Sequence, residues 1–176
     1  MILPKKQLLS ALVITFNEEK NIETVINDLA FADEIIVVDS FSSDRTFEIA
    51  STFKNVKIVQ RVFDNFAFQR NYALSLAINP WILFIDADER LTPELKNEIK
   101  VVISQKNNIS AFFMRRNFMF ENKNLRFSGW QTDKIIRLFK KNDAIYNKEK
   151  IVHEKLIIKG DTRTLKNKLI HHSYSN

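Results

Sequence analysis

The chain of 176 residues lacks cysteine altogether, has only the glycines Gly129 and Gly160, and contains no long apolar run. Without cysteine it forms neither disulfides nor thiolate metal sites, which agrees with a cytoplasmic location. Two isolated glycines exclude both a GxGxxG dinucleotide turn and a Walker phosphate loop, so any nucleotide must be held in another way. No segment offers the roughly 18 uncharged apolar residues of a membrane helix, and residues 1–6 do not resemble a signal peptide. We therefore expect a cytoplasmic protein.

Charge is distributed unevenly along the chain, whose net charge is +6. Residues 1–110 contain 12 Lys and Arg against 15 Asp and Glu, whereas residues 111–176 contain 15 against 6. The basic part favours an anionic partner such as nucleic acid, a phosphorylated lipid or an anionic membrane surface, unless it is simply a solvated lysine-rich face. Because its basic residues are dispersed and no aromatic RNA-binding signature is present, we expect no nucleic-acid partner.

A strand followed by carboxylates is the most informative segment of the sequence. The apolar run 81–85, which is typical of a buried strand, leads directly into Asp86, Asp88 and Glu89. In open α/β sheets ligands bind at the carboxyl ends of the strands. Two aspartates separated by one residue can bind one Mg²⁺ or Mn²⁺ ion, which can in turn bind a diphosphate. The alternative interpretation is an acidic turn in which Asp88 or Glu89 starts the next helix.

Predicted strands alternate with predicted helices over the first two thirds of the chain. Apolar runs predict strands at residues 8–15, 34–39, 56–59 and 81–85. Helical spacing predicts helices at residues 22–29, 66–78 and 93–103, and another through Ile49 and Phe53. From residue 110 onward we expect mainly strands, at residues 111–120, 134–140, 151–158 and 165–172. This order predicts an α/β fold in which a mostly parallel central sheet carries helices on both faces and a smaller strand-rich lobe follows.

Three of the expected parallel strands end in polar residues. These are Thr15, Asn17 and Glu18 after the first strand, Asp39 at the end of the second, and Asp86 and Asp88 after the fourth. Because the carboxyl ends of parallel strands meet at one edge of the sheet, we expect the three sets to converge on one crevice. Asp39 suits a hydrogen bond from the N3–H group of a uracil ring, or instead it caps the following turn through Ser42 or Ser43.

Several segments, taken in this order, resemble the signatures of family 2 glycosyltransferases with the GT-A fold. They are residues 12–19, 37–46, 69–73 and 83–89. Three later segments resemble the branch that contains lipopolysaccharide-core β-glucosyltransferases, namely residues 129–130, 136–139 and 152–154. The resemblance extends from residue 8 to residue 174 and implies a Rossmann-like GT-A fold that binds a nucleotide-diphospho-sugar. We expect a single domain, residues 1–176, with a nucleotide-sugar-binding half at 1–109 and an acceptor-side lobe at 110–176 that is truncated at its C-terminal end.

The resemblance also implies roles for individual residues on the donor side. Thr15, Asn17, Glu18 and Asp39 would border the nucleotide, and Arg70 would lie near the diphosphate. Asp88 would bind the divalent metal, Mn²⁺ or Mg²⁺, directly, and Asp86 would contact the ribose or a metal-bound water. One departure from the family concerns the turn beside the nucleotide, where the family usually has glycine and this chain has Phe41.

An inverting transfer needs charge neutralisation at the leaving group and a base at the acceptor. A cation on Asp88 would neutralise the charge that develops on the departing nucleoside diphosphate. A carboxylate would take the proton of the acceptor hydroxyl from the opposite face of the sugar. Asp133 is the first candidate for this base and Glu154 is the second.

Histidines and one tryptophan complete the candidate site. His153 is either a further ligand of the metal or diphosphate, or an interior histidine held by a hydrogen bond. His171 and His172, near the end of the chain, are weaker candidates. Trp130 either stacks on the acceptor sugar or anchors its own loop.

We expect the chain to transfer a sugar with inversion and with the help of a metal. The expected donor is a nucleotide sugar, UDP-linked by preference. The expected acceptor belongs to the lipopolysaccharide core or is another glycan or lipid-linked molecule. Such an enzyme of cell-envelope synthesis would lie in the cytoplasm, with peripheral contact to the inner face of the anionic cytoplasmic membrane as a further expectation. Two alternatives remain open. One is another metal-dependent sugar-nucleotide enzyme, such as a nucleotidyltransferase, and the other is a non-catalytic module that binds an anionic ligand.

Overall fold

The structure is a computed structural model that describes residues 7–120, 123–124, 133–147 and 156–172. Its strands are β1 (Leu9–Thr15), β2 (Glu34–Asp39), β3 (Val56–Gln60), β4 (Trp81–Phe84), β5 (Glu89–Leu91), β6 (Ile109–Phe120), β7 (Lys123–Asn124), β8 (Lys134–Lys140), β9 (Ala144–Tyr146), β10 (Leu156–Ile158) and β11 (Asp161–His172). Its helices are α1 (Ile22–Asp28), α2 (Thr46–Ser51), α3 (Phe66–Leu76) and α4 (Pro93–Ser104), with a 3₁₀ turn at Lys141–Asp143. None of these helices is long and apolar enough to cross a membrane.

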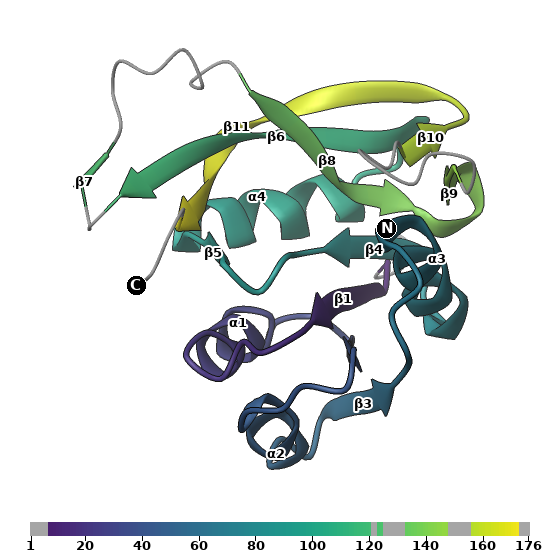
Figure 1. Ribbon diagram of the computed structural model, residues 1–176. Coiled ribbons are helices and arrows are strands. Elements are labelled where there is room, and N and C mark those ends of the chain that lie inside the picture. Colours follow the sequence, from purple (N-terminus) through teal and green to yellow (C-terminus); the bar gives the residue numbers. More distant parts are fainter. Residues whose placement is uncertain (1–6, 121–122, 125–132, 148–155, 173–176) are drawn as a thin grey trace.

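One mixed sheet forms the centre of the described structure (Figure 1). Its strand order is β3-β2-β1-β4-β8-β6-β11-β5, with β7 beside β6, while β9 and β10 pair separately. The first four strands in this order are parallel, and β8 joins β4 in the antiparallel sense. The predicted α/β architecture is therefore confirmed, and the strand-rich second part continues the same sheet.

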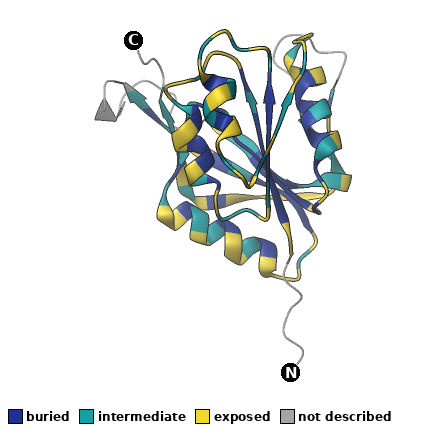
Figure 2. Ribbon diagram, turned by 90° about the horizontal axis from the view of Figure 1, so that it is seen from below, coloured by how far each residue is buried: buried dark blue, intermediate teal, exposed yellow. Residues whose placement is uncertain are grey.

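Helices cover both faces of the parallel half, as the alternating pattern predicts. One apolar core packs α1, α2 and α4 against the sheet, and a second core packs α3 against the opposite face. Figure 2 shows that the central strands are buried and that the helices expose only their outer sides. Thr92 begins α4 as expected, because its hydroxyl accepts a hydrogen bond from the backbone N–H of Leu95 and Pro93 occupies the first turn.

The last long strand returns the chain to the carboxylate segment. β11 begins at Asp161, earlier than the predicted residue 165, and runs parallel to β6. Near its end it pairs with the short strand β5, so that Leu169 lies opposite Leu91 and His171 opposite Glu89. Of the strand predicted at 151–158, only the part at 156–158 falls within the described residues, where it forms β10.

Candidate active site

A cavity of about 580 Å³ lies at the carboxyl ends of the parallel strands. We call it the strand-end cavity. The polar residues that line it are Thr15, Glu18, Ser40, Arg70, Asp86, Asp88 and His171. The sequence predicted that polar residues at the ends of β1, β2 and β4 would meet in one crevice. Residues at the ends of β1 and β4 do line this cavity, whereas Asp39 at the end of β2 does not.

Strand register explains why these residues meet. Thr15 at the end of β1 lies opposite Asp39 at the end of β2. On the other side of β1, Leu12 pairs with Phe84, and the backbone N–H of Ile85 donates to the carbonyl of Leu12 at 3.0 Å. Strand β4 therefore ends before β1 does, and the segment that follows it turns across the end of β1.

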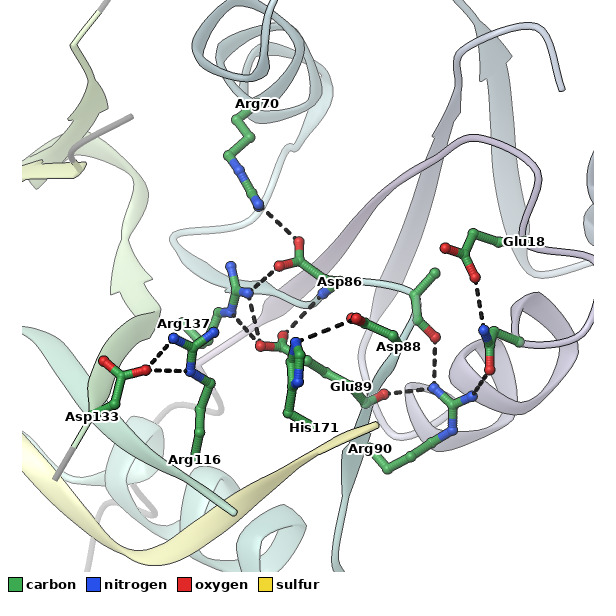
Figure 3. A network of polar contacts seen from close by, with 12 residues as sticks. Glu18, Arg70, Asp86, Asp88, Glu89, Arg90, Arg116, Asp133, Arg137 and His171 are labelled. Atoms are coloured by element: carbon green, nitrogen blue, oxygen red, sulfur yellow. Dashed lines mark hydrogen bonds and ion pairs between the residues drawn. The ribbon is translucent and has the colours of Figure 1, made fainter. Parts of the chain in front are cut away.

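Two arginines and two carboxylates fix the turn after β4 (Figure 3). Arg70 from α3 donates to Oδ1 of Asp86 at 2.8 Å, and Arg137 from β8 contacts Oδ2 of the same carboxylate. Arg137 also donates to Oε1 of Glu89 at 2.8 Å. The other carboxylate oxygen of Glu89 accepts the backbone N–H of Asp86 at 3.0 Å. The side chain of Asp86 is thus held by arginines from outside the turn, and its backbone is held by Glu89 within the turn.

The two carboxylates of this network differ in their affinity for a proton. Burial alone would raise the pKa of Asp86, but attraction to Arg137 and Arg70 outweighs it and holds that pKa well below its usual range. Burial raises the pKa of Glu89 to about 7, because the attraction of Arg137 offsets it only in part and the charge of Asp86 adds to it. Asp86 is therefore the member of the pair that stays ionised, and Glu89 is the one that accepts a proton first.

Asp88 projects into the cavity beside a histidine from the end of β11. The distance from Oδ2 of Asp88 to Nε2 of His171 is 3.3 Å, and Figure 3 shows the two side chains facing each other. The backbone N–H of His172 donates to the carbonyl of Asp88 at 3.0 Å and ties the two segments together. Burial lowers the pKa of His171 despite the nearby charge of Asp88, so its imidazole is neutral at neutral pH.

This pair of side chains fits a divalent cation. A carboxylate oxygen and a neutral imidazole nitrogen are both ligands that Mn²⁺ accepts, whereas Mg²⁺ prefers oxygen alone. Within the described ranges no three or more His, Cys, Asp or Glu residues gather closely enough to form a complete metal site. A cation at Asp88 and His171 would therefore depend on oxygen ligands from a substrate or from water.

Comparison with known families shows which family the chain belongs to. The family model described as "Glycosyl transferase family 2" matches residues 10–159. The chain belongs to this family.

Curated relatives within family 2 include proteins from Rickettsia and Rhizobium. An uncharacterized glycosyltransferase of Rickettsia typhi is 34% identical over 143 residues, which are 78% of this chain and 48% of that protein. The lipopolysaccharide core biosynthesis glycosyltransferase LpsC of Rhizobium meliloti is 26% identical over 164 residues, which are 91% of this chain and 60% of LpsC. The chain thus spans about half the length of its Rickettsia relative.

Solved structures show that the fold is the GT-A fold of family 2. The structure of S. aureus TarS 1-349 in complex with UDP-GlcNAc superposes with a TM-score of 0.72 at 19% identity, covering 97% of this chain and 60% of that one. Glucosyl-3-phosphoglycerate synthase from Mycobacterium tuberculosis, solved with Mn²⁺, UDP and glucosyl-3-phosphoglycerate, gives a TM-score of 0.54 at 21% identity over 64% of this chain and 44% of that one.

The end of β1 and the loop that follows it carry three of the residues that the family resemblance assigns to the nucleotide. Thr15 is buried, and its hydroxyl has no hydrogen-bond partner in the described part of the chain. Burial raises the pKa of Glu18, which lines the strand-end cavity. Asn17, at a φ of 56°, does not line that cavity, because its side chain accepts the backbone N–H of Ser43 at 2.8 Å and holds the neighbouring turn.

Asp39 makes the contacts of the capping alternative, and its role towards a nucleotide stays a prediction. It is fully buried, and its carboxylate accepts hydrogen bonds from the backbone N–H of Ser42 and from the side-chain amide of Gln60, both at 3.1 Å. It does not line the strand-end cavity. In the same turn Phe41 adopts a φ of 59°, a left-handed conformation that the glycine usual in the family adopts without strain.

The candidate residues of the acceptor side are placed only in part. Asp133 lies at the start of β8, where Nε of Arg116 donates to its carboxylate at 2.9 Å, and it does not line the strand-end cavity. Trp130, His153 and Glu154 lie outside the described residues. Their predicted roles therefore stay predictions.

Sequence reasoning missed two features of the site. The first is Arg137, which the sequence could have revealed. It is a charged residue within the otherwise apolar segment 135–139, and a buried charge needs a partner of opposite charge. The second is an aromatic wall formed by Phe63 and Phe66, whose rings pack edge to face with centroids 5.0 Å apart and which both line the cavity. No local pattern distinguishes these phenylalanines from core residues.

Proposed function

We propose that this chain binds a UDP-linked sugar with a divalent cation and transfers the sugar, with inversion, to a glycan or lipid-linked acceptor, such as one of the lipopolysaccharide core. The proposal rests on one observation: the same cavity at the strand ends is lined by Asp88, His171, Arg70 and Asp86. It is supported by family membership, by the name of LpsC, and by solved relatives whose structures hold UDP-GlcNAc, or Mn²⁺ with UDP.

Asp88 and His171 would hold the cation, which when bound supplies positive charge against the departing diphosphate. The carboxylate of Asp88 is the more exposed of the two carboxylates of the Asp-Ala-Asp turn, and the two arginine contacts of Asp86 leave it less able to act as a metal ligand. We therefore assign direct binding to Asp88 and give Asp86 a positioning role towards Arg70.

Arg70 is well suited to the diphosphate because its orientation is already fixed. Its guanidinium lies 4.7 Å above the ring of Phe84 and is bonded to Asp86, and it also lines the cavity. A buried arginine held in this way loses little conformational entropy when it binds a phosphate oxygen.

The nucleobase would lie against the aromatic wall of the strand-end cavity. Phe63 and Phe66 are 43% and 50% exposed, which is unusual for two phenylalanines in mutual contact. Stacking of a base on such rings removes apolar surface from water without reading the base's edge.

For the base that activates the acceptor we retain Asp133 first and Glu154 second. In the present structure Arg116 neutralises the carboxylate of Asp133. To accept a proton from an acceptor hydroxyl, Asp133 must exchange this contact for one with the acceptor. A cytoplasmic location and contact with an anionic membrane surface also remain proposals.

Calorimetric titration of the purified chain with UDP, GDP and ADP in the presence of Mn²⁺ tests the donor assignment. We expect UDP to bind and the two purine nucleotides to bind at least about tenfold more weakly, since a wall shaped for one ring limits a larger base. Equal binding of all three would refute a uridine site, and absence of binding in a folded sample would refute the proposed function.

A further inference from the structure

A second cavity, of about 420 Å³, lies on the other side of Asp86 from the strand-end cavity. We call it the basic cavity. Arg70 and Asp86 line both cavities, whereas the rest of the basic cavity comes from β6, β8, β9 and β10. A ligand in the basic cavity would therefore be adjacent to the end of the strand-end cavity where Arg70 and Asp86 lie.

Cationic side chains dominate the polar lining of the basic cavity. Among the described residues they are Arg70, Arg116, Lys134 and Arg137, against one lining carboxylate, that of Asp86. Each of the three arginines contacts a carboxylate. When the partners Glu89 and Asp133 behind the lining are included, the described residues place four positive charges against three negative ones, so that this part of the lining retains a positive charge.

Lys134 is the source of this excess charge. Its ammonium group lies 4.6 Å from the ring centroid of Phe113, and within the described residues no carboxylate forms an ion pair with it. The remaining walls are largely apolar and aromatic, with Ile136, Tyr146 and Leu156 among them. Such a lining fits a ligand whose ring or carbon chain carries one anionic group. The apolar walls can cover the ring or chain, and the cationic side chains can bind the anionic group.

We propose that the basic cavity binds a phosphate or carboxylate group of the acceptor, so that the acceptor is an acidic saccharide or a phosphate-bearing glycan. This inference rests on the proposed function, because it places the acceptor beside a donor in the strand-end cavity. Arg116 and Lys134 contact the anionic group, and Arg70 and Arg137 remain bound to their own carboxylates.

The same arrangement links acceptor binding to the base. Nε and Nη2 of Arg116 both donate to one oxygen of Asp133. An acceptor anion that takes over Arg116 competes with this contact and releases the carboxylate of Asp133 next to the acceptor. Without an acceptor, the carboxylate of Asp133 is therefore occupied by its ion pair with Arg116. It becomes available as a base when an acidic acceptor binds Arg116.

The test uses the chain saturated with UDP and Mn²⁺, so that the strand-end cavity is already filled. Glucose 6-phosphate, glucuronate and methyl glucoside are then titrated by calorimetry or by NMR chemical shifts. We expect both acidic sugars to bind more tightly than the neutral glycoside, and the stronger of the two identifies the phosphate or the carboxylate as the preferred group.

Two lysine variants separate a specific site from general positive charge. Lys134→Gln should weaken binding of the acidic sugars about tenfold, as expected for loss of one charge-assisted contact. Lys140→Gln is the matched control, since Lys140 lies on the same strand and also packs over an aromatic ring, that of Trp81, but does not line the cavity. It should leave the affinity unchanged.

Three results would overturn the inference. Equal binding of methyl glucoside would show that the cavity does not select an anion, and equal losses in the two lysine variants would show that the site lies elsewhere. Acidic sugars that bind the chain in a parallel titration without UDP, but not the UDP-saturated chain, would assign the basic cavity to the donor, and the proposed function would survive. If UDP itself fails to bind, both the proposed function and this inference fall.

Discussion

At the scale of single residues, the lining of the strand-end cavity combines polar and aromatic side chains. Asp88 and His171 are among the polar residues, and Phe63 and Phe66 form the aromatic wall. A nucleoside diphosphate likewise combines a flat base with charged phosphates. The polar residues and the aromatic wall can therefore be tested separately.

Replacing Phe66 by alanine should weaken UDP binding by about tenfold, because stacking of a base on an aromatic ring contributes roughly 1–3 kcal/mol. Phe68→Ala is the matched control: the same residue type on the same helix, 38% exposed and not on the cavity lining. Calorimetry with UDP measures both variants. Equal losses in the two variants would contradict a nucleobase on the aromatic wall.

The sequence predicts the place of a residue in the site where that place depends only on neighbouring residues in the chain. Asp86 and Asp88 follow an apolar run, and their place at a strand end needed no further information. His171 was only a weak candidate, because its contact with Asp88 arises from the pairing of β11 with β5. That register depends on contacts between distant segments, which composition and spacing do not reveal.

At the scale of the elements, the turns after β1 and β2 support each other through side-chain oxygens. Asp44 accepts the backbone N–H of Thr46 at the start of α2 and that of Glu19 in the β1 loop, both at 3.0 Å. Burial alone would raise the pKa of Asp44, but these hydrogen bonds, together with that of the Thr46 hydroxyl, outweigh it and lower the pKa below its ordinary value. Asp44 therefore joins the two turns that border the cavity.

Asp44→Ala should cost about 1 kcal/mol of unfolding free energy at pH 7, the usual cost of losing a carboxylate at a helix start. Because the folded-state pKa is lowered, this stabilisation is fully present above about pH 4 and is lost as the pH falls through the folded-state pKa. Thermal unfolding of both proteins between pH 7 and 3 measures the difference. Glu48→Ala, in the exposed pair with Arg45, is the control and should change little. A difference that grows on acidification would contradict the assignment.

The elements of the parallel half were predictable because each is bounded by local signals. Apolar runs define β1, β2 and β4, and Thr92 with Pro93 defines the start of α4. The order of β8, β6, β11 and β5 was not predictable, since any of these strands could pair with any other on local pattern alone.

At the scale of the whole molecule, the parallel and antiparallel parts of the sheet meet between β4 and β8. Arg137 of β8 crosses this junction and contacts both Asp86 and Glu89 of the turn after β4. Its side chain is 3% exposed and that of Glu89 is fully buried, so water cannot replace either partner. Asp86 lines both the strand-end and the basic cavity, and Arg137 lines the basic cavity.

Arg137→Met should destabilise the fold by about 3–5 kcal/mol, because it removes one partner of a buried ion pair and leaves Glu89 without its cation. Chemical denaturation measures the loss. Arg163→Met on β11 removes an exposed arginine and should cost far less. A loss for Arg137→Met of no more than about 1 kcal/mol would show that the junction does not depend on this contact.

The central claim is that the Asp-Ala-Asp turn holds a cation together with a nucleoside diphosphate. Titration of UDP into the wild-type chain, Asp88→Asn and the exposed control Asp161→Asn, each with Mn²⁺ and with a chelator, tests it most directly. We predict that Mn²⁺ strengthens UDP binding at least about tenfold in the wild type and the control, and that Asp88→Asn abolishes this effect. UDP binding that is the same with Mn²⁺ and chelator, or the same in Asp88→Asn as in the wild type, would contradict the account.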